Sequence, residues 1–376
     1  MSLYEAVKNS ADRKKTFDEY LTYIARQNRY LLRTLLELSP VCNFLCPFCY
    51  ARKTLGELSE EGKSILRFPF WKSILDQLSE MGVMYIGLTG GECMLHPDFL
   101  QIYEYAAQKG FFVYLISNGS CLTDDILETF KKYPPIGVNI TIYGGSEETY
   151  QKISGRGEYY NIVKNNLQKL SEANVPFSIQ MTVSRDNVKD VPKVFELSRH
   201  FNVRFSCANT LISCERCTKD VQAINNVSDD EYRKAMRLLH QIDNAGSTVT
   251  QLAVPKKINI KGITCSAGRS SAFINHEGEM MLCVSYQETR VSTFEHSVKE
   301  CWQEIVKAAD QIPQIDECNG CIHATHCIHC FGAHYYDTGK FATPSPELCF
   351  KKKHPEEAAK IEAYYEINGS LPPADF

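Results

Sequence analysis

Three cysteines, Cys42, Cys46 and Cys49, lie within eight residues of one another in the stretch SPVCNFLCPFCYARKT (39–54). Thiolates are ligands for zinc and for iron–sulfur clusters. A structural zinc site usually has four protein ligands, and disulfides need cysteines in pairs. The trio therefore indicates a metal centre that keeps one ligand position open, or a zinc site completed by a distant ligand.

A second group of cysteines lies towards the C-terminal end. Its members have the spacing Cys265-x12-Gly278-x4-Cys283, then Cys318-x2-Cys321-x5-Cys327-x2-Cys330, and finally Cys349. The histidines between them could also bind metal: His323, His326 and His329. A zinc ribbon over Cys318–Cys330 is therefore an alternative to an iron–sulfur site. We interpret the pair Cys214 and Cys217, which has no partner pair, as incidental.

Composition describes a globular protein rather than a membrane or nucleic-acid-binding one. The 376 residues are 44% hydrophobic and 23% charged, with a formal net charge of -4, so we expect no general attraction to nucleic acid or anionic membranes. We find neither a signal peptide nor an apolar run of membrane-spanning length, which predicts a cytoplasmic protein. In that reducing compartment the 16 cysteines are expected to be metal ligands or free thiols.

Short apolar runs alternate with helical periodicity from Leu31 onward. The runs are RTLLEL (33–38), VMYIGL (83–88), FFVYLIS (111–117), IGVNITI (136–142), FSIQMTV (177–183) and VRFSC (203–207). This alternation predicts an α/β fold with a parallel sheet, open or closed into a full or partial barrel. The cysteine trio, TGGE (89–92) and SNGS (117–120) follow the first three runs. Because chemistry gathers at the carboxyl ends of parallel strands, we expect these three loops on one rim.

Three regions are expected along the chain: a helical extension over 1–30, a barrel over 31–245, and a cysteine-rich domain with a C-terminal helix over 246–376. In the last region, INHEGEMMLC (274–283) predicts a β-hairpin that turns at Glu277–Gly278.

The Cys-x3-Cys-x2-Cys spacing after a strand, with a GGE loop one strand later, resembles radical S-adenosylmethionine (SAM) enzymes. The resemblance implies a partial (β/α)6 TIM-like barrel. It also implies that the three thiolates hold a [4Fe–4S] cluster whose fourth iron binds SAM. It places Tyr50 near the adenine and the loop Gly90, Gly91 and Glu92 near the SAM amino group. The further cofactor-binding candidates are Ser117 and Asn118 near the ribose, with Thr141 and Arg185 on later strands. Cys93 departs from the proline that often follows GGE, which puts a thiol near the expected site.

The second group of cysteines is similar to the SPASM domain, a β-hairpin with short helices that binds auxiliary [4Fe–4S] clusters. The resemblance assigns an outer cluster to Cys318, Cys321, Cys327 and Cys349. It assigns an inner cluster to Cys265, Cys283 and Cys330, whose fourth ligand stays open. Ser270 and Ser271 stand where some relatives have another cysteine, and two residues rather than three separate the last pair.

The resemblance implies reductive cleavage of SAM to a 5′-deoxyadenosyl radical, which abstracts hydrogen from the substrate. We favour oxidative modification or cross-linking of a ribosomally made peptide, with a flavodoxin- or ferredoxin-like electron donor. Only about forty residues precede the trio, too few for a leader-binding domain, which suggests either a separate leader-binding protein or a substrate that needs no leader. The alternatives are sulfatase-maturase-like protein oxidation, oxidation of a tetrapyrrole or sugar, and a zinc-binding interaction module. No catalytic acid or base is assigned.

Overall fold

The structure is a computed structural model that describes residues 17–208, 227, 231–232, 234–236, 263–324, 327–369 and 371. An open sheet of nine strands in the order β6-β5-β4-β3-β2-β1-β7-β8-β9 runs through these residues. The first six strands are parallel: β1 (Arg33–Glu37), β2 (Tyr85–Thr89), β3 (Phe112–Ser117), β4 (Gly137–Thr141), β5 (Phe177–Thr182) and β6 (Phe205–Ala208). Each lies within two residues of its predicted run, which confirms the partial-barrel prediction.

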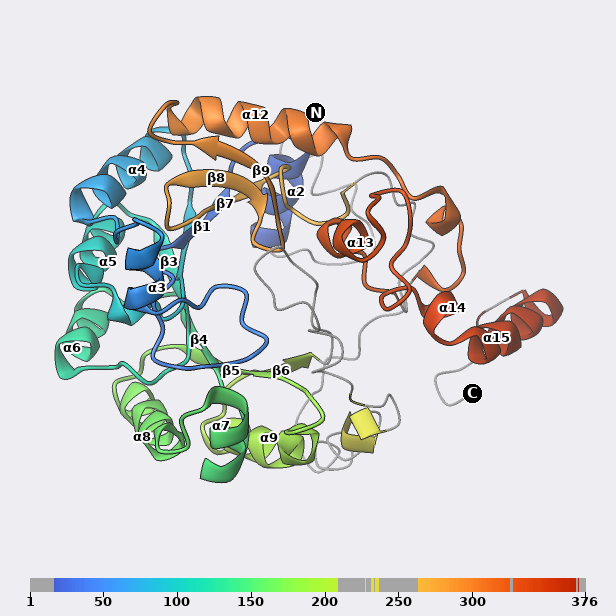
Figure 1. Cartoon of the computed structure of the whole chain (residues 1–376), viewed down its shortest axis with the longest axis horizontal. Coiled ribbons are helices and arrows are strands. Elements are labelled where there is room, and N and C mark those ends of the chain that lie inside the picture. Colours follow the sequence, from blue (N-terminus) through green and yellow to red (C-terminus); the bar gives the residue numbers. More distant parts are fainter. Residues whose placement is uncertain are drawn as a thin grey trace.

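Helices form an outer layer around the parallel strands (Figure 1). Those of the barrel are α4 (Phe68–Glu80), α5 (Phe99–Gln108), α6 (Asp124–Lys132), α7 (Glu147–Ser154), α8 (Tyr159–Glu172) and α9 (Val191–His200). Helix α2 (Phe17–Asn28) precedes β1, and α3 (Leu55–Glu60) follows the cysteine trio. Short 3-10 helices η1 (Cys93–Leu95) and η2 (Val188–Asp190) also belong to the barrel, whereas η3 (Asp316–Cys318) lies in the cysteine-rich region.

The cysteine-rich region extends the same sheet. Strand β7 (Ser271–Ile274) pairs in parallel with β1, and β8 (Glu279–Cys283) and β9 (Tyr286–Ser292) continue antiparallel. The predicted hairpin is therefore present, and its first strand joins it directly to the barrel. Helices follow: α12 (Val298–Gln311), α13 (Phe331–Thr338), α14 (Phe350–Lys353) and α15 (Pro355–Asn368).

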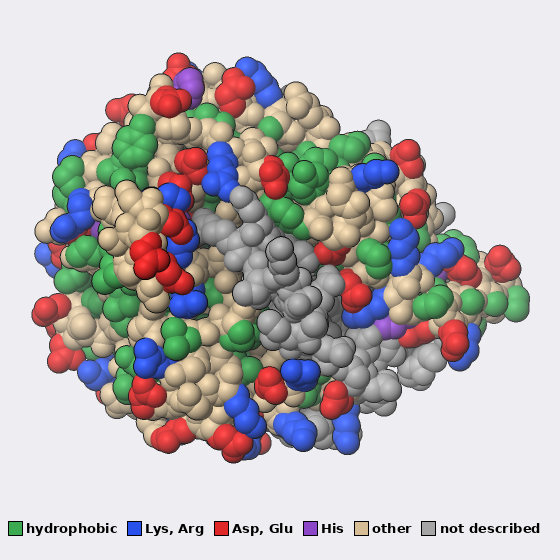
Figure 2. Space-filling model, viewed as in Figure 1, with side chains coloured by type: hydrophobic (Ala, Val, Ile, Leu, Met, Phe, Trp, Pro, Cys, Tyr) green, Lys and Arg blue, Asp and Glu red, His purple; other side chains and the backbone are tan. Residues whose placement is uncertain are grey.

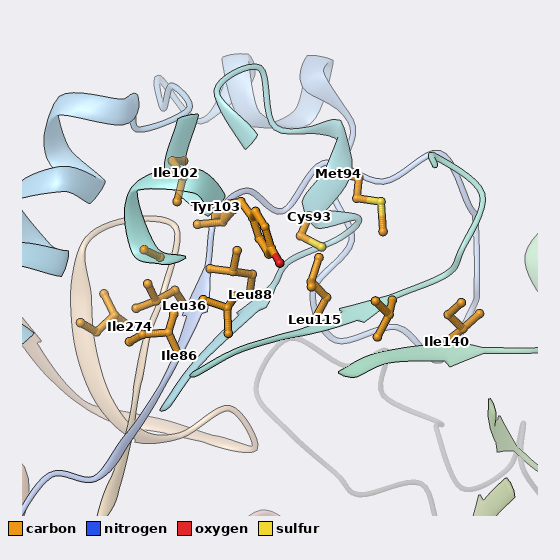
Figure 3. Packing of buried hydrophobic residues seen from close by; sticks show 14 of the residues in the cluster. Leu36, Ile86, Leu88, Cys93, Met94, Ile102, Tyr103, Leu115, Ile140 and Ile274 are labelled. Atoms are coloured by element: carbon orange, nitrogen blue, oxygen red, sulfur yellow. The ribbon is translucent and has the colours of Figure 1, made fainter. Parts of the chain in front are cut away.

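A single large core fills the space between strands and helices. Figure 3 shows Leu36, Ile86, Leu88 and Leu115 from neighbouring strands packing with Ile102 and Tyr103 of α5. Burial of these side chains, each worth about 1.5–3 kcal/mol, fixes the strand ends that carry the site.

No described helix is long and apolar enough to span a bilayer. Figure 2 shows acidic and basic side chains interspersed on the face it displays. On that face the surface agrees with the small net charge of the sequence.

Candidate active site

The three-cysteine loop begins at Ser39, two residues after Glu37, the last residue of β1, and so lies at the carboxyl end of that strand. A bridge between Val41 and Lys53 closes the loop at its base. Within it, the Cys49 N–H donates to the Cys46 carbonyl at 3.2 Å, and the Phe44 N–H points at the Cys42 sulfur at 3.4 Å. The loop is therefore folded back on itself, and its three thiols lie near enough to act on one another's pKa.

Phe44 anchors this loop to the barrel. Its ring is buried and meets the rings of Tyr143, Tyr150 and Tyr159 at centroid distances of 5.5, 6.3 and 5.2 Å. The Leu45 N–H donates to the carbonyl of Ser154, the last residue of α7, at 2.7 Å. Edge-to-face contacts of this kind add to the burial energy, so the loop is held rigidly against α7 and α8.

The chemistry of the three thiols fits a cationic metal centre. Burial, with the nearby charges of Glu92 and Cys49, raises the pKa of Cys42 to about 12. Burial also raises the pKa values of Cys46 and Cys49, and in Cys46 the other two thiols of the trio add to the effect. Without a bound cation these thiols stay protonated, whereas a metal centre releases the protons and neutralises the thiolates. Three converging thiols thus suit an iron–sulfur cluster that takes three protein ligands.

The GGE loop packs directly on the start of the cysteine loop. The Gly91 N–H donates to the Ser39 carbonyl at 2.8 Å, and the Glu92 N–H donates to the Val41 carbonyl at 2.9 Å. A Cβ on Gly90 would lie 2.3 Å from the Ser39 carbonyl oxygen, and one on Gly91 would lie 2.4 Å from that of Pro40. The glycines therefore allow the backbones of two rim loops to touch.

Glu92 is fully buried and bonded within the protein. Its carboxylate accepts hydrogen bonds from the Ser117 hydroxyl at 2.9 and 3.0 Å, the Asn118 N–H at 2.7 Å and the Met94 N–H at 3.1 Å. Desolvation raises the pKa of Glu92, and these donors act against that shift. Glu92 and Ser117, expected from the resemblance to lie at SAM, thus join the second and third rim loops to each other.

Asn118 connects this junction to the trio. Its side-chain amide donates to the Asn43 side-chain oxygen at 3.0 Å and lies 3.7 Å from the Cys42 sulfur. Asn43 in turn donates to the Ser120 hydroxyl at 2.9 Å. The sequence interpretation passed over Asn43, although its position between two cysteines was a usable signal.

The other cofactor-binding candidates lie at different places on the rim. Tyr50 is half-buried directly after Cys49, and Thr141 is half-buried at the carboxyl end of β4. Arg185 is exposed, beyond the end of β5. Their roles toward SAM stay predictions.

Cys93 lies in the core beneath the rim. Its side chain is fully buried, and Figure 3 shows it among the core residues near Leu115. Its sulfur is 3.6 Å from the Ile116 carbonyl and 3.7 Å from a Glu92 carboxylate oxygen. Burial followed by the charge of Glu92 raises its pKa well above the usual value.

We expect Cys93 to resist alkylation because only the thiolate is nucleophilic and this thiol is neither ionised nor accessible. The measurement is peptide mass spectrometry after iodoacetamide treatment of the folded protein at neutral pH. Cys265, which is exposed, serves as the reactive control in protein without metal. Labelling of Cys93 at the rate of Cys265 would contradict the buried position.

The structure brings the four proposed outer ligands together. Burial and then the nearby Cys349 and Cys321 raise the pKa of Cys318 to about 11. Burial also raises the pKa of Cys327 to about 12, with Cys349, Cys321 and Cys318 as further contributors. Cys318 and Cys327 are therefore each near Cys321 and Cys349, and the Phe350 N–H, next to Cys349 in the chain, donates to the Cys327 sulfur at 3.2 Å.

The three proposed inner ligands come from three separate segments of the chain. Although the Cys265 side chain reaches the surface, desolvation by the surrounding atoms raises its pKa, and the nearby Cys283 and Cys330 add to this shift. The Ser285 hydroxyl lies 3.2 Å from the Cys283 sulfur and 3.8 Å from that of Cys330. Ser285 is thus the polar neighbour that the sequence did not indicate. Ser270 is instead buried beneath β1, where its carbonyl accepts the Leu32 and Arg33 N–H groups.

Two of the histidines near the outer ligands have a carboxylate or a backbone carbonyl as hydrogen-bond partner. His323 Nε2 lies 3.2 Å from a Glu362 carboxylate oxygen, and His329 Nε2 lies 2.9 Å from the Ala324 carbonyl. His326, Cys214 and Cys217 lie outside the described residues. Across the described ranges, no three His, Cys, Asp or Glu side chains are arranged to hold a single metal ion.

Comparison with known proteins identifies the family. Residues 36–198 match the model of the radical SAM superfamily. The AdoMet-dependent heme synthase of Methanosarcina barkeri is 22% identical over 84% of this chain and 95% of its own length. The sporulation killing factor maturation protein SkfB of Bacillus subtilis is 30% identical, but over 50% of this chain and 45% of its own length. The PqqA peptide cyclase of Bradyrhizobium diazoefficiens is 23% identical over 72% of this chain and 73% of its own length.

Solved structures share the fold over nearly the whole chain. Streptococcus suis SuiB, bound to S-adenosylmethionine, superposes with a TM-score of 0.68 at 13% identity, covering 92% of this chain and 86% of SuiB. The structure of anSMEcpe with bound AdoMet gives 0.65 at 16% identity, covering 91% of this chain and 96% of anSMEcpe. At these identities the likeness concerns the fold. The family match places a radical SAM domain over residues 36–198, and the resemblance inferred from the sequence is confirmed there.

Proposed function

We propose that this enzyme oxidatively modifies a ribosomally made peptide, using a [4Fe–4S] cluster held by Cys42, Cys46 and Cys49. The observation that carries the proposal is that the loop of these three cysteines packs against the GGE loop at the carboxyl ends of β1 and β2. When bound, the cluster and SAM supply one-electron cleavage of the sulfonium and removal of a hydrogen atom from an unactivated C–H bond. The protein holds the loop rigid through Phe44 and the Gly91 contact.

The cysteine-rich region would act as a SPASM domain. We assign an outer auxiliary cluster to Cys318, Cys321, Cys327 and Cys349, because Cys318 and Cys327 each lie near the other two. We assign an inner one to Cys265, Cys283 and Cys330, next to Ser285. Such clusters would accept the electron that the substrate gives up when it is oxidised. A low-potential donor of the flavodoxin or ferredoxin kind would reduce the first cluster.

The inner face of β4 and β5 favours a peptide substrate. Val138 and Ile140 are buried against the helices, so Asn139 and Thr141 face the barrel interior by strand alternation. On β5 the half-buried Ser178, Gln180 and Thr182 alternate with buried residues in the same way. These neutral side chains can donate and accept hydrogen bonds with peptide groups. The choice of a peptide agrees with the names of three similar proteins: SkfB, PqqA peptide cyclase, and SuiB bound to its precursor peptide SuiA.

A second candidate is oxidation of a tetrapyrrole. It is favoured by the heme synthase relative, which this chain covers over 95% of that protein's length. The acidic groups of a tetrapyrrole would need Lys or Arg, whereas the half-buried positions of β4 and β5 carry none. We therefore place the peptide first.

The test uses anaerobically reconstituted, reduced enzyme with SAM and candidate peptides encoded near its gene. We expect about 8–12 iron atoms per chain, at four per cluster, and 5′-deoxyadenosine as a product. The modified peptide should lose about two hydrogens in mass, the result of a two-electron oxidation. Turnover of a coproporphyrin but of no peptide would move the assignment to the second candidate. Stoichiometric zinc without sulfide would overturn both.

A further inference from the structure

A buried glutamate–histidine pair joins the first barrel strand to the hairpin of the cysteine-rich region. Glu37, the last residue of β1, is 1% exposed, and His276 is 3% exposed. One oxygen of Glu37 accepts the His276 backbone N–H at 3.2 Å and lies 2.9 Å from the His276 ring Nδ1. Removing two ionisable groups from water costs free energy, so this pair adds little to the stability of the fold. A role in holding the two segments in place explains it better.

Glu37 lies at the base of the proposed active site. It precedes Cys42 by five residues and pairs in the sheet with Thr89, the residue before Gly90. It is close enough to Cys49 for its charge to act on that thiol. A shift of Glu37 would therefore move both the cysteine loop and the GGE loop.

The same hairpin turn also contacts the segment that leaves the cysteine loop. The Glu277 carboxylate lies 2.8 Å from the Lys63 ammonium, which lies 3.2 Å from Glu61. Glu61 in turn binds Lys53 at 2.6 Å, and Lys53 closes the base of the cysteine loop with Val41. The turn thus holds both ends of the loop.

The turn itself is rigid. The Asn275 side-chain oxygen accepts the N–H groups of Glu277 and Glu279 at 3.0 and 2.9 Å. Gly278 adopts a positive φ of 79°, and a Cβ there would lie 2.7 Å from the Phe294 ring. His276 is held between two carboxylates, since its Nε2, which is buried and has no hydrogen bond, lies 3.5 Å from Glu277. Among the residues that the structure describes, the His276 ring therefore hydrogen-bonds Glu37 alone.

We propose that residues 275–278, here called the hairpin clamp, position the SAM-binding loops of the barrel, with Glu37 and His276 as positioning residues. The inference rests on the cluster assignment to Cys42, Cys46 and Cys49. With this role of the hairpin clamp, the cysteine-rich region is a structural part of the SAM site as well as a carrier of auxiliary clusters.

The test compares His276→Ala with His276→Asn in the reconstituted full-length enzyme. Asparagine can place its amide where Nδ1 lies and donate to Glu37, whereas alanine cannot. We expect His276→Ala to weaken SAM binding about tenfold, the effect of one hydrogen bond to a charged group. The electron paramagnetic resonance (EPR) signal of the reduced, SAM-bound cluster should change as well. His276→Asn should restore both, and the exposed His296→Ala should change neither.

Equal SAM affinity and equal EPR spectra for His276→Ala and the wild type would overturn the clamp. Should circular dichroism show that His276→Ala does not fold, the double variant Lys63→Met, Glu277→Gln decides the question. It removes only partly exposed contacts, and we expect a loss of SAM affinity of about twofold. An unchanged affinity in that variant would also overturn the clamp. A wild-type protein without any cluster signal would instead refute the cluster assignment itself.

Discussion

Alanine in place of Cys42, Cys46 or Cys49 is expected to abolish the release of 5′-deoxyadenosine from SAM. Each variant removes one thiolate from a site for which the sequence provides only three. Iron content should fall by about four atoms per chain, the content of one cluster. Chromatography of the reaction products and iron analysis measure the two effects.

Cys301→Ala is the matched control. Cys301 is fully buried in α12, and its sulfur lies 3.7 and 3.9 Å from the Ser292 and His296 carbonyls. We expect full iron content and undiminished SAM cleavage in this variant. Retention of SAM cleavage in all three variants of the trio would refute the assignment.

Gly91→Ala is expected to prevent stable cluster binding in an otherwise folded protein. The added methyl group would lie 2.4 Å from the Pro40 carbonyl oxygen and 2.5 Å from that of Val41, both on the backbone that enters the cysteine loop. Neither atom can turn away as a side chain would, so the loop must shift. Strain of this kind costs about 1–3 kcal/mol or more, and the loop carries it directly to Cys42. Visible absorption and EPR of the reconstituted protein report the loss.

The control for this variant is Gly137→Ala in β4. A Cβ at Gly137 meets no atom within 4 Å. The same Gly→Ala change in β4 should therefore leave the absorption and EPR spectra of the cluster unchanged. Normal cluster content and SAM cleavage in Gly91→Ala would show that the contact between the two rim loops is not needed.

The barrel could be predicted from the sequence because each of its strands has apolar residues at least at alternate positions. The runs 33–38, 136–142 and 177–183 coincide with β1, β4 and β5, in which buried and half-buried residues alternate over most of the strand. The convergence of the three rim loops followed from the parallel arrangement alone. The hairpin turn at Glu277–Gly278 was also predictable, because glycine marks the turn between two apolar segments.

Contacts between distant segments were not predictable from local patterns. Glu37 and His276 are 239 residues apart, and neither stands in a motif that indicates a partner. The continuation of the barrel sheet into β7 likewise has no signal in either strand alone. Glu92 was expected to bind SAM because the motif is known for that, whereas its burial against Ser117 and Asn118 depends on the packing of two loops.

The most direct test of the central claim is electron–nuclear double resonance of the reduced enzyme with SAM labelled with nitrogen-15 in its amino group. If the trio leaves one iron open for SAM, the labelled nitrogen binds that iron and shows hyperfine coupling to the cluster. We expect this coupling in the wild type and its loss in Cys46→Ala. A reduced wild-type protein that cleaves SAM yet shows no coupling to the labelled nitrogen would contradict the account.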